Sequence, residues 1–152
     1  MIFSPLDLIF FIFRDESLGN KYFSINSEKY LDFLLSIWPN PVSVILKLNE
    51  KYQELLQSET GAFRIPNHRF CKKLIDELKM PLVSTSVNRT GSEPLNDPSQ
   101  IIQEFSNEVD TIFYSDKKSF FAASTLIDLN KSEPVLVREG KIKFVELMKK
   151  LN

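Results

Sequence analysis

The sequence predicts an α/β fold in which one mixed sheet is flanked by helices, and three observations lead to it. First, the chain has 152 residues, 43% hydrophobic and 26% charged, which suits one globular domain with a buried core. Second, segments with the two-residue period of strands alternate with segments that have the helical period. Third, we find no linker, internal repeat or low-complexity tract. A single domain over residues 1–152 is therefore expected.

The first predicted strand is the apolar run from Leu8 to Phe13, which is far shorter than the ~20 residues of a membrane span. If this strand lies at an edge of the sheet, we expect it to cause self-association. Ser27 then caps a helix that Pro39 ends, since the apolar residues follow helical spacing: Tyr30, Phe33, Leu34, Ile37 and Trp38. Residues 42–48 alternate between apolar and polar side chains, apart from Ile45, and predict a strand with one buried face.

The middle of the chain continues this alternation of strands and helices. We expect a short helix over residues 50–58, a strand over residues 62–65, and a helix that begins at Pro66 and Asn67. The last of these helices has apolar residues along one side: Phe70, Leu74, Ile75 and Leu78. Residues 81–85, PLVST, are the next predicted strand, and a loop rich in hydroxyl and amide groups follows it.

The C-terminal third is predicted to hold two helices and three strands. Asp97 is an N-cap candidate, Pro98 occupies the first helical position, and apolar residues follow at helical spacing. The remaining elements are strands over residues 111–114 (TIFY), 124–129 (STLIDL) and 134–137 (PVLV), and a closing helix over residues 144–151.

Charge and cysteine content limit the partners and the compartment. Nineteen basic and twenty acidic residues give a formal net charge of −1, so no overall positive field attracts nucleic acid or an anionic membrane. Any contact with RNA must therefore be local. Cys71 is the single cysteine and no secretory signal is recognisable, which together predict a protein of the reducing cytoplasm.

Residue counts also limit the chemistry. One histidine and one cysteine cannot form a thiolate or imidazole zinc site, and the four glycines are too scattered for a dinucleotide-binding or Walker loop. His68 stands at the start of a predicted helix, where a capping or solvated role is commoner than that of a general base. Cys71 lies near the apolar side of the same helix and is interpreted as a small core residue. We therefore assign no catalytic side chain and no metal ligand.

Four short polar segments remain as candidates for a binding site. Each places hydroxyl groups or an arginine at a strand end or in a loop: TGAFRIP (60–66), STSVN (84–88), ST (124–125) and VREG (137–140). In open α/β sheets, ligands gather beyond strand ends, and an arginine fork with hydroxyl and loop N–H groups suits carboxylate and phosphate. Each segment alone is typical of a plain turn, but the four together favour an anion site.

The order of these segments resembles that in the YrdC-like family of threonylcarbamoyl-adenylate synthases. TGAFRIPNHRF and LKMPLVSTSVNRTG, followed by ASTLIDL and VLVREG, are similar to the family's ordered motifs, and WPNPVSVIL (38–46) resembles its W-P-G-P-x-T segment. The resemblance runs from about residue 30 to residue 140, with departures at Asn40, Val87, Thr90 and Ala123. It implies a single YrdC-like domain built on a twisted open mixed sheet.

This resemblance implies a nucleotidyltransferase that joins L-threonine, bicarbonate and ATP into threonylcarbamoyl-AMP for the threonylcarbamoyladenosine modification of tRNA. Carried over position by position, Arg64 and Ser124 bind threonine. The residues implied to bind ATP are Thr60, Ser84, Ser86, Asn88 and Arg138. Mg²⁺ is an expected cofactor, held mainly by substrate oxygens and water. Expected partners are tRNA or other double-stranded RNA and the downstream threonylcarbamoyl-transfer proteins, but no membrane.

The family's usual pattern begins with a segment that carries T-D-T-x-Y-G-L and a K-x-R pair, and no such residues occur here. We therefore expect a domain that is truncated at its N-terminus relative to the family, with little or no synthase activity as it stands. The alternative is an inactive family remnant that binds nucleotide or RNA, or regulates a partner. Basic residues near the C-terminus support this alternative, although they are more typical of a solvated helix face: Arg138, Lys141, Lys143, Lys149 and Lys150.

Overall fold

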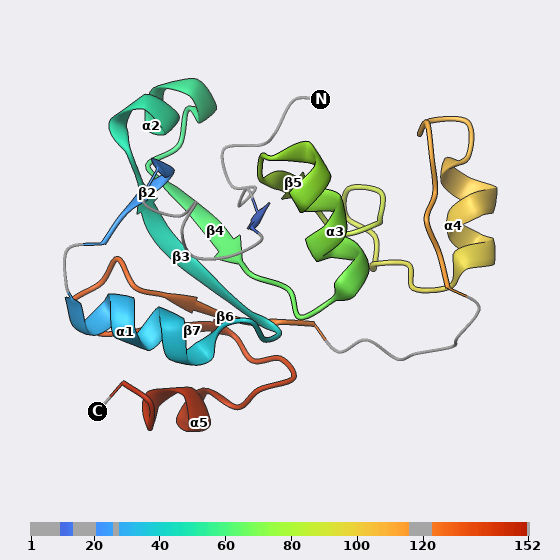
Figure 1. Ribbon diagram of the computed structural model, residues 1–152. Coiled ribbons are helices and arrows are strands. Elements are labelled where there is room, and N and C mark those ends of the chain that lie inside the picture. Colours follow the sequence, from blue (N-terminus) through green and yellow to red (C-terminus); the bar gives the residue numbers. More distant parts are fainter. Residues whose placement is uncertain (1–9, 14–20, 26–27, 116–122, 152) are drawn as a thin grey trace. The chain divides into compact units, whose positions relative to one another are not determined.

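The computed structural model describes residues 10–13, 21–25, 28–115 and 123–151, and it confirms the α/β class (Figure 1). The chain divides into two compact units: a sheet unit, Met1–Ser84 with Ala123–Asn152, and an α4 unit, Thr85–Ala122. The elements of the sheet unit are β1 (Phe10–Ile12), β2 (Phe23–Ser24), α1 (Glu28–Ile37), β3 (Val42–Leu48), α2 (Glu50–Leu56), β4 (Thr60–Arg64), α3 (Arg69–Leu78), β5 (Leu82–Ser84), β6 (Thr125–Asp128), β7 (Val135–Arg138) and α5 (Phe144–Met148). Helix α4 (Pro98–Phe105) forms the other unit with its loops. No helix in the described ranges has the length and apolar character needed to cross a membrane.

The strands form one mixed sheet with the order β5-β1-β4-β3-β6-β7, and β2 pairs with β3 outside this path. The pairs β1/β4 and β3/β6 are parallel, while the other pairs are antiparallel. Strand β1 therefore lies inside the sheet, between β5 and β4, and not at an edge. Self-association was expected only if this strand lay at an edge of the sheet, and the described strand Phe10–Ile12 does not. Leu8 and Ile9, which belong to the same predicted strand, lie outside the described residues.

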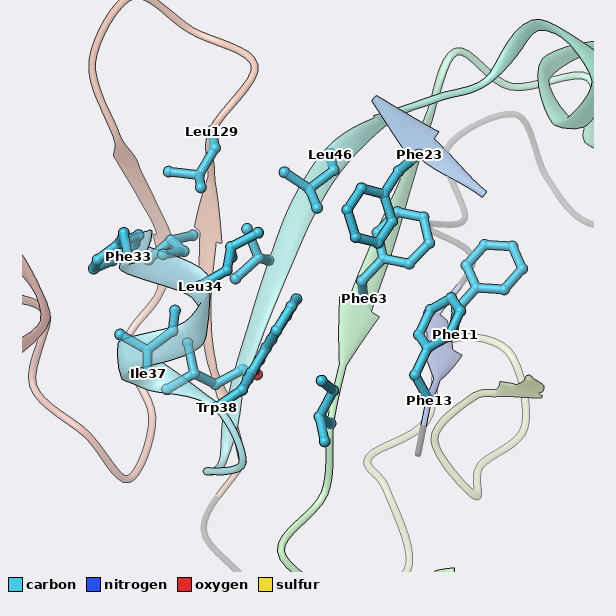
Figure 2. Packing of buried hydrophobic residues seen from close by; sticks show 14 of the residues in the cluster. Phe11, Phe13, Phe23, Phe33, Leu34, Ile37, Trp38, Leu46, Phe63 and Leu129 are labelled. Carbon is cyan, nitrogen blue, oxygen red and sulfur yellow. Dashed lines mark hydrogen bonds between the residues drawn. The ribbon is translucent and has the colours of Figure 1, made fainter. Parts of the chain in front are cut away.

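One face of the sheet carries the main hydrophobic core, and we call it the core face (Figure 2). Phe63 of β4 is fully buried there, with its ring centroid 5.1 Å from that of Phe11 and 4.6 Å from that of Phe23. Alternate residues of β3 join this cluster, as the pleat of a strand requires: Val42, Val44, Leu46 and Leu48. Helices α1 and α5 contribute the residues that pack against these strands: Phe33, Leu34, Ile37 and Leu147.

Gly61 shows how closely the core face is packed. A Cβ atom at this position in β4 would come within 2.9 Å of the Phe11 ring and 3.3 Å of Leu48. A larger residue would therefore force the aromatic rings to move, and a glycine suits this position in the strand.

The second face of the sheet has a smaller apolar cluster of Ile45, Ala62 and Leu126. These residues come from the neighbouring strands β3, β4 and β6, so they bury the centre of the sheet on this side as well. Ile45 interrupts the predicted alternation of β3 because the strand is buried on both faces at that point.

The strand predicted over residues 111–114 is wrong. Phe113 and Tyr114 are exposed, and no strand of the described sheet pairs with this segment. Aromatic and β-branched residues favour a strand only where a neighbouring strand accepts their backbone hydrogen bonds, and none is supplied here. The two-residue strand β2 was missed for the opposite reason, since it is too short to show any alternation.

The helices agree with the sequence prediction except at their ends. Helix α3 begins at Arg69 and not at Pro66, because the backbone of His68 is extended, with φ of −137°, and takes the N-cap position. Helix α5 ends at Met148, earlier than the predicted residue 151. The predicted cap Ser27 lies outside the described residues.

The α4 unit has its own network of contacts. Asp97 caps α4 as predicted, since its side chain accepts a hydrogen bond of 2.8 Å from the N–H of Ser99. The Arg89 guanidinium donates to Glu104 Oε1 at 3.1 Å and to both carboxylate oxygens of Glu108. These bonds tie the loop before α4 to the end of that helix.

Candidate functional site

Five predicted site residues belong to the sheet unit, and the pleat of the strands places them on the second face: Thr60, Arg64, Ser84, Ser124 and Arg138. In β4, Thr60 and Arg64 each stand two residues from Ala62, so the three side chains share a face. In β7, Arg138 is the cross-strand partner of Leu126. The face without the main core therefore gathers the polar candidates.

Ser124 and Arg138 are in direct contact. The Arg138 guanidinium donates to the carbonyl oxygen of Ser124 from Nε at 3.2 Å and from Nη2 at 3.1 Å, and Nη2 also donates to the Ser124 hydroxyl at 3.3 Å. This hydroxyl lies 2.9 Å from the hydroxyl of Ser43, a buried residue of β3. The sequence prediction missed Ser43, although WPNPVSVIL places it where the similar W-P-G-P-x-T segment has its threonine.

A close backbone crossing fixes Ser124 next to the loop that follows β7. A Cβ atom on Gly140 would lie 2.3 Å from the carbonyl oxygen of Ala123 and 2.5 Å from the nitrogen of Thr125, so only glycine fits. The N–H of Gly140 donates to the Thr125 hydroxyl at 3.1 Å, and the N–H of Lys141 donates to the Ala123 carbonyl at 3.0 Å. These contacts explain the glycine at the end of VREG.

Arg64 is the last residue of β4 and supplies a second guanidinium group near that of Arg138. Its Nε is buried and has no hydrogen-bond partner among the described residues. Burial lowers the pKa of Arg64, Cys71 acts in the opposite direction, and the positive charge of Arg138 lowers the pKa further. Arg64 is half-buried and Arg138 is exposed, and a half-buried cation with a second cation nearby is typical of a site for an anion. We call the following residues the arginine–serine centre: Ser43, Arg64, Ser124 and Arg138.

The first turn of α3 brings His68 and Cys71 near Arg64. Burial raises the pKa of the Cys71 thiol, and the positive charge of Arg64 opposes this rise. Cys71 Sγ lies 3.6 Å from Nδ1 of His68, which is exposed and makes no side-chain cap hydrogen bond. Over the described ranges, no group of three His, Cys, Asp or Glu side chains is arranged to hold a metal ion.

Thr60 and Ser84 lie on the same face but away from Arg64. Thr60 begins β4, so its Cα is ~13 Å from that of Arg64 at the usual rise of a strand. Ser84 ends β5 and pairs with Phe10, which in turn pairs with Ala62, so it is level with the middle of β4. The sheet unit therefore separates the predicted residues into the arginine–serine centre and two more distant hydroxyl groups.

Ser86 and Asn88 belong to the α4 unit and are described there. The Ser86 hydroxyl donates to Oδ1 of Asn88. The Asn88 amide donates to the carbonyl oxygens of Arg89 and Ser92, both at 3.0 Å. The Asn88 side chain therefore holds the shape of its own loop.

The side chains of three of the five basic residues near the C-terminus have partners within the described part of the chain. Lys143 Nζ lies 3.0 Å from Oε2 of Glu139, and Lys150 Nζ donates to the Ser36 carbonyl at 2.8 Å. Since Arg138 is also engaged, with Ser124, these side chains are less free to contact phosphates than the sequence suggested. No such partner is found for the Lys141 and Lys149 side chains among the described residues, so an RNA-binding surface at this place stays a prediction.

The comparison with family models gives a match over most of the chain. The Sua5/YciO/YrdC model, described as "Telomere recombination", matches residues 8–140. A threonylcarbamoyl-AMP synthase from Pyrococcus abyssi (strain GE5 / Orsay) is 27% identical over 114 residues, which cover 74% of this chain and 34% of that protein. A threonylcarbamoyl-AMP synthase from Idiomarina loihiensis is 40% identical over 81 residues, which cover 52% of this chain and 44% of that protein. The chain thus spans less than half the length of these two relatives.

Solved structures share the fold. The crystal structure of P. abyssi Sua5 complexed with L-threonine has a TM-score of 0.85 at 22% identity, and covers 95% of this chain and 43% of that one. The crystal structure of E. coli YciO has a TM-score of 0.80 at 26% identity, and covers 92% of this chain and 69% of that one.

Proposed function

Because the chain belongs to the Sua5/YciO/YrdC family, we propose that it makes threonylcarbamoyl-AMP from L-threonine, bicarbonate and ATP. In this proposal, the amino group of threonine takes up bicarbonate to give a carbamate and water. A carbamate oxygen then attacks the α-phosphorus of ATP, and the bond to pyrophosphate breaks. The two relatives named threonylcarbamoyl-AMP synthase support this reaction. The product would feed the threonylcarbamoyladenosine modification of tRNA through downstream transfer proteins.

The contact between Ser124 and Arg138, beside Arg64, is the observation that carries the proposal. Arg64 binds the threonine carboxylate, because a planar guanidinium offers two parallel charge-assisted hydrogen bonds and its buried Nε–H has no partner in the described protein. The Ser124 hydroxyl binds threonine or its carbamate. Arg138 uses Nε and Nη2 to hold Ser124, which leaves the Nη1 donors for the phosphates of ATP.

Hydroxyl groups supply the remaining contacts to ATP in this proposal. Thr60 and Ser84 offer hydroxyls on the second face of the sheet, whereas the hydroxyl of Ser86, in the loop that follows β5, already donates to Asn88 Oδ1. Asn88 supports the same loop through its amide bonds. Neutral hydroxyl and N–H groups suit a nucleotide, because they donate hydrogen bonds to its phosphate oxygens.

Positioning and electrostatic stabilisation do most of the catalysis in the proposed reaction. Negative charge grows on pyrophosphate as the carbamate oxygen approaches, so the guanidinium of Arg138 stabilises the transition state without a general base, while Arg64 positions threonine. A bound Mg²⁺, held mainly by substrate oxygens and water, would neutralise further phosphate charge.

The direct test uses the purified chain with L-threonine, ¹⁴C-bicarbonate, ATP and Mg²⁺. Because the T-D-T-x-Y-G-L and K-x-R residues do not occur in this sequence, we expect labelled threonylcarbamoyl-AMP only in small amounts by chromatography, with an equal amount of pyrophosphate, and we expect neither product from the Arg64→Ala/Arg138→Ala double variant. If the chain binds ATP but makes no product under any of these conditions, the synthase assignment fails and the nucleotide-binding alternative replaces it.

A further inference from the structure

We propose that Ser43 is a positioning residue: its hydroxyl donates a hydrogen bond to Ser124 and so keeps the Ser124 proton free for an anionic substrate oxygen. This inference rests on the function proposed above and goes beyond it, because no substrate contact of Ser43 is involved. Its basis is the hydrogen-bond arrangement of the arginine–serine centre.

Ser43 is held where its hydroxyl needs a partner from the protein. It lies in the middle strand β3, only 1% exposed, and the cross-strand residue is Leu126. A hydroxyl in such surroundings is retained where it is hydrogen-bonded, and its Oγ lies 2.9 Å from Oγ of Ser124. The structure gives Ser43 no other side-chain hydrogen bond within the described part of the chain. The pair therefore works as a unit.

The number of donors and acceptors decides the direction of the bond. A serine hydroxyl has one proton and two acceptor positions. Arg138 can only donate, so its bond from Nη2 at 3.3 Å occupies one acceptor position of Ser124. If Ser43 donates to the second position, both hydroxyls are satisfied and the Ser124 proton points away from Ser43 and Arg138. If Ser124 donated instead, the Ser43 proton would have no acceptor among the described groups.

The charge of the centre selects the same direction. Arg64 and Arg138 attract a carboxylate, carbamate or phosphate, and the oxygens of these groups only accept hydrogen bonds. If Ser124 pointed a lone pair at an anionic substrate oxygen, the two oxygens would repel each other. If Ser124 points its proton at that oxygen, a hydrogen bond forms. Ser43 thereby turns Ser124 into a donor without touching the substrate.

Kinetics of three variants test this role. Ser43→Ala is expected to raise the KM for L-threonine about tenfold, the equivalent of one lost hydrogen bond to a charged group, with kcat within about twofold of wild type. Ser43→Thr keeps the hydroxyl and is expected to restore the wild-type KM. The matched control is Ser36→Ala, which removes a hydroxyl that donates to the Phe33 carbonyl in α1. If Ser43→Ala and Ser43→Thr both raise the KM for threonine and the KM for ATP by the same factor, the proposal is overturned. Such a result would mean that the substitutions disturb packing alone.

Neutron diffraction reads the direction of the bond without any substrate. A deuteron bound to Ser43 Oγ and lying between the two oxygens supports the proposal, and a deuteron bound to Ser124 Oγ in that position overturns it. If the wild-type chain makes no threonylcarbamoyl-AMP, the proposed function fails, but the neutron result still decides the role of Ser43.

Discussion

The two arginines of the arginine–serine centre differ in their partners, and this difference implies different tasks. Arg138 is anchored on Ser124 by three hydrogen bonds, whereas the buried Nε of Arg64 has no partner in the described protein. An anchored guanidinium can present only its outer N–H groups. An unanchored and partly buried one gains most from a ligand that supplies the missing acceptor.

Single alanine substitutions should separate the two tasks. Arg64→Ala is expected to raise the KM for threonine more than that for ATP, and Arg138→Ala is expected to do the reverse. Loss of a charge-assisted hydrogen bond of ~1.5–3 kcal/mol corresponds to a change of roughly 10- to 150-fold. Steady-state kinetics with each substrate varied in turn measure both values, with the exposed Lys51→Ala as control. Equal effects of each arginine variant on both substrates would indicate general destabilisation.

A second test at this scale compares two glycines. Gly140→Ala places a Cβ atom 2.3–2.5 Å from backbone atoms, which cannot move independently, whereas Gly61→Ala meets the side chains of Phe11 and Leu48. We expect Gly140→Ala to lower the free energy of unfolding by ~1–3 kcal/mol or more, and by more than Gly61→Ala does. The reason is that a side chain packed against backbone atoms can be accommodated only if the whole loop moves. Urea denaturation of both variants gives the comparison. A smaller loss for Gly140→Ala than for Gly61→Ala would contradict the close crossing described here.

The sequence predicted part of the centre and could not predict the rest. Arg64, Ser124 and Arg138 were expected at one site because the motifs that carry them resemble those of a family. Ser43 was missed because its contact with Ser124 joins residues 81 positions apart. Such a pairing depends on the register between β3 and β6, and no local pattern in either strand contains it.

At the scale of elements, strand β3 has the bounds that the sequence predicts. Strand β3 matches residues 42–48 because four of its residues face the core and the alternation is strong. Residues 111–114 have a similar strand-like composition, yet no neighbouring strand pairs with them in the described sheet. Composition therefore predicts that a segment can form a strand, and tertiary structure decides whether it does.

Helix α4 offers a pH-dependent test, because Arg89 joins its loop to Glu108 just beyond the helix. The hydrogen bond from Arg89 lowers the pKa of Glu108 below the ordinary 4.5. The folded state therefore holds the carboxylate charged, so this contribution to stability is present above the ordinary pKa and is lost as the pH falls through the folded pKa. An NMR titration should give a Glu108 midpoint below 4.5 in the wild type. The midpoint should return to the ordinary value in Arg89→Gln, and identical midpoints in the two proteins would refute the contact.

At the scale of the whole sheet unit, stability and chemistry belong to different faces. The aromatic core and the residues of α1 lie against the core face (Figure 2), where Leu147 of α5 also packs, and the arginine–serine centre lies on the second face. The two faces share backbone but few side-chain contacts, because successive residues of a strand point to opposite sides.

The core face should therefore respond to substitution mainly through stability. Phe63→Ala removes a fully buried ring from the centre of the aromatic cluster, and it is expected to lower the free energy of unfolding by ~3–5 kcal/mol. Leu55→Ala, at an exposed position of α2, should change it by less than ~0.5 kcal/mol. Urea denaturation followed by circular dichroism measures both. A loss of similar size in the two variants would show that Phe63 is not central to the core.

The separation of faces also determines which amino-acid substitutions strand β4 would tolerate. In a library that varies this strand one position at a time, selection for abundance in the cell should reject substitutions at Gly61 and Phe63. Selection for growth that depends on the product should reject those at Thr60 and Arg64, even in variants that remain abundant. The two selections would then reject different positions among the five consecutive residues of this strand, and Ala62, fully buried in the apolar cluster of the second face, would respond to the selection for abundance.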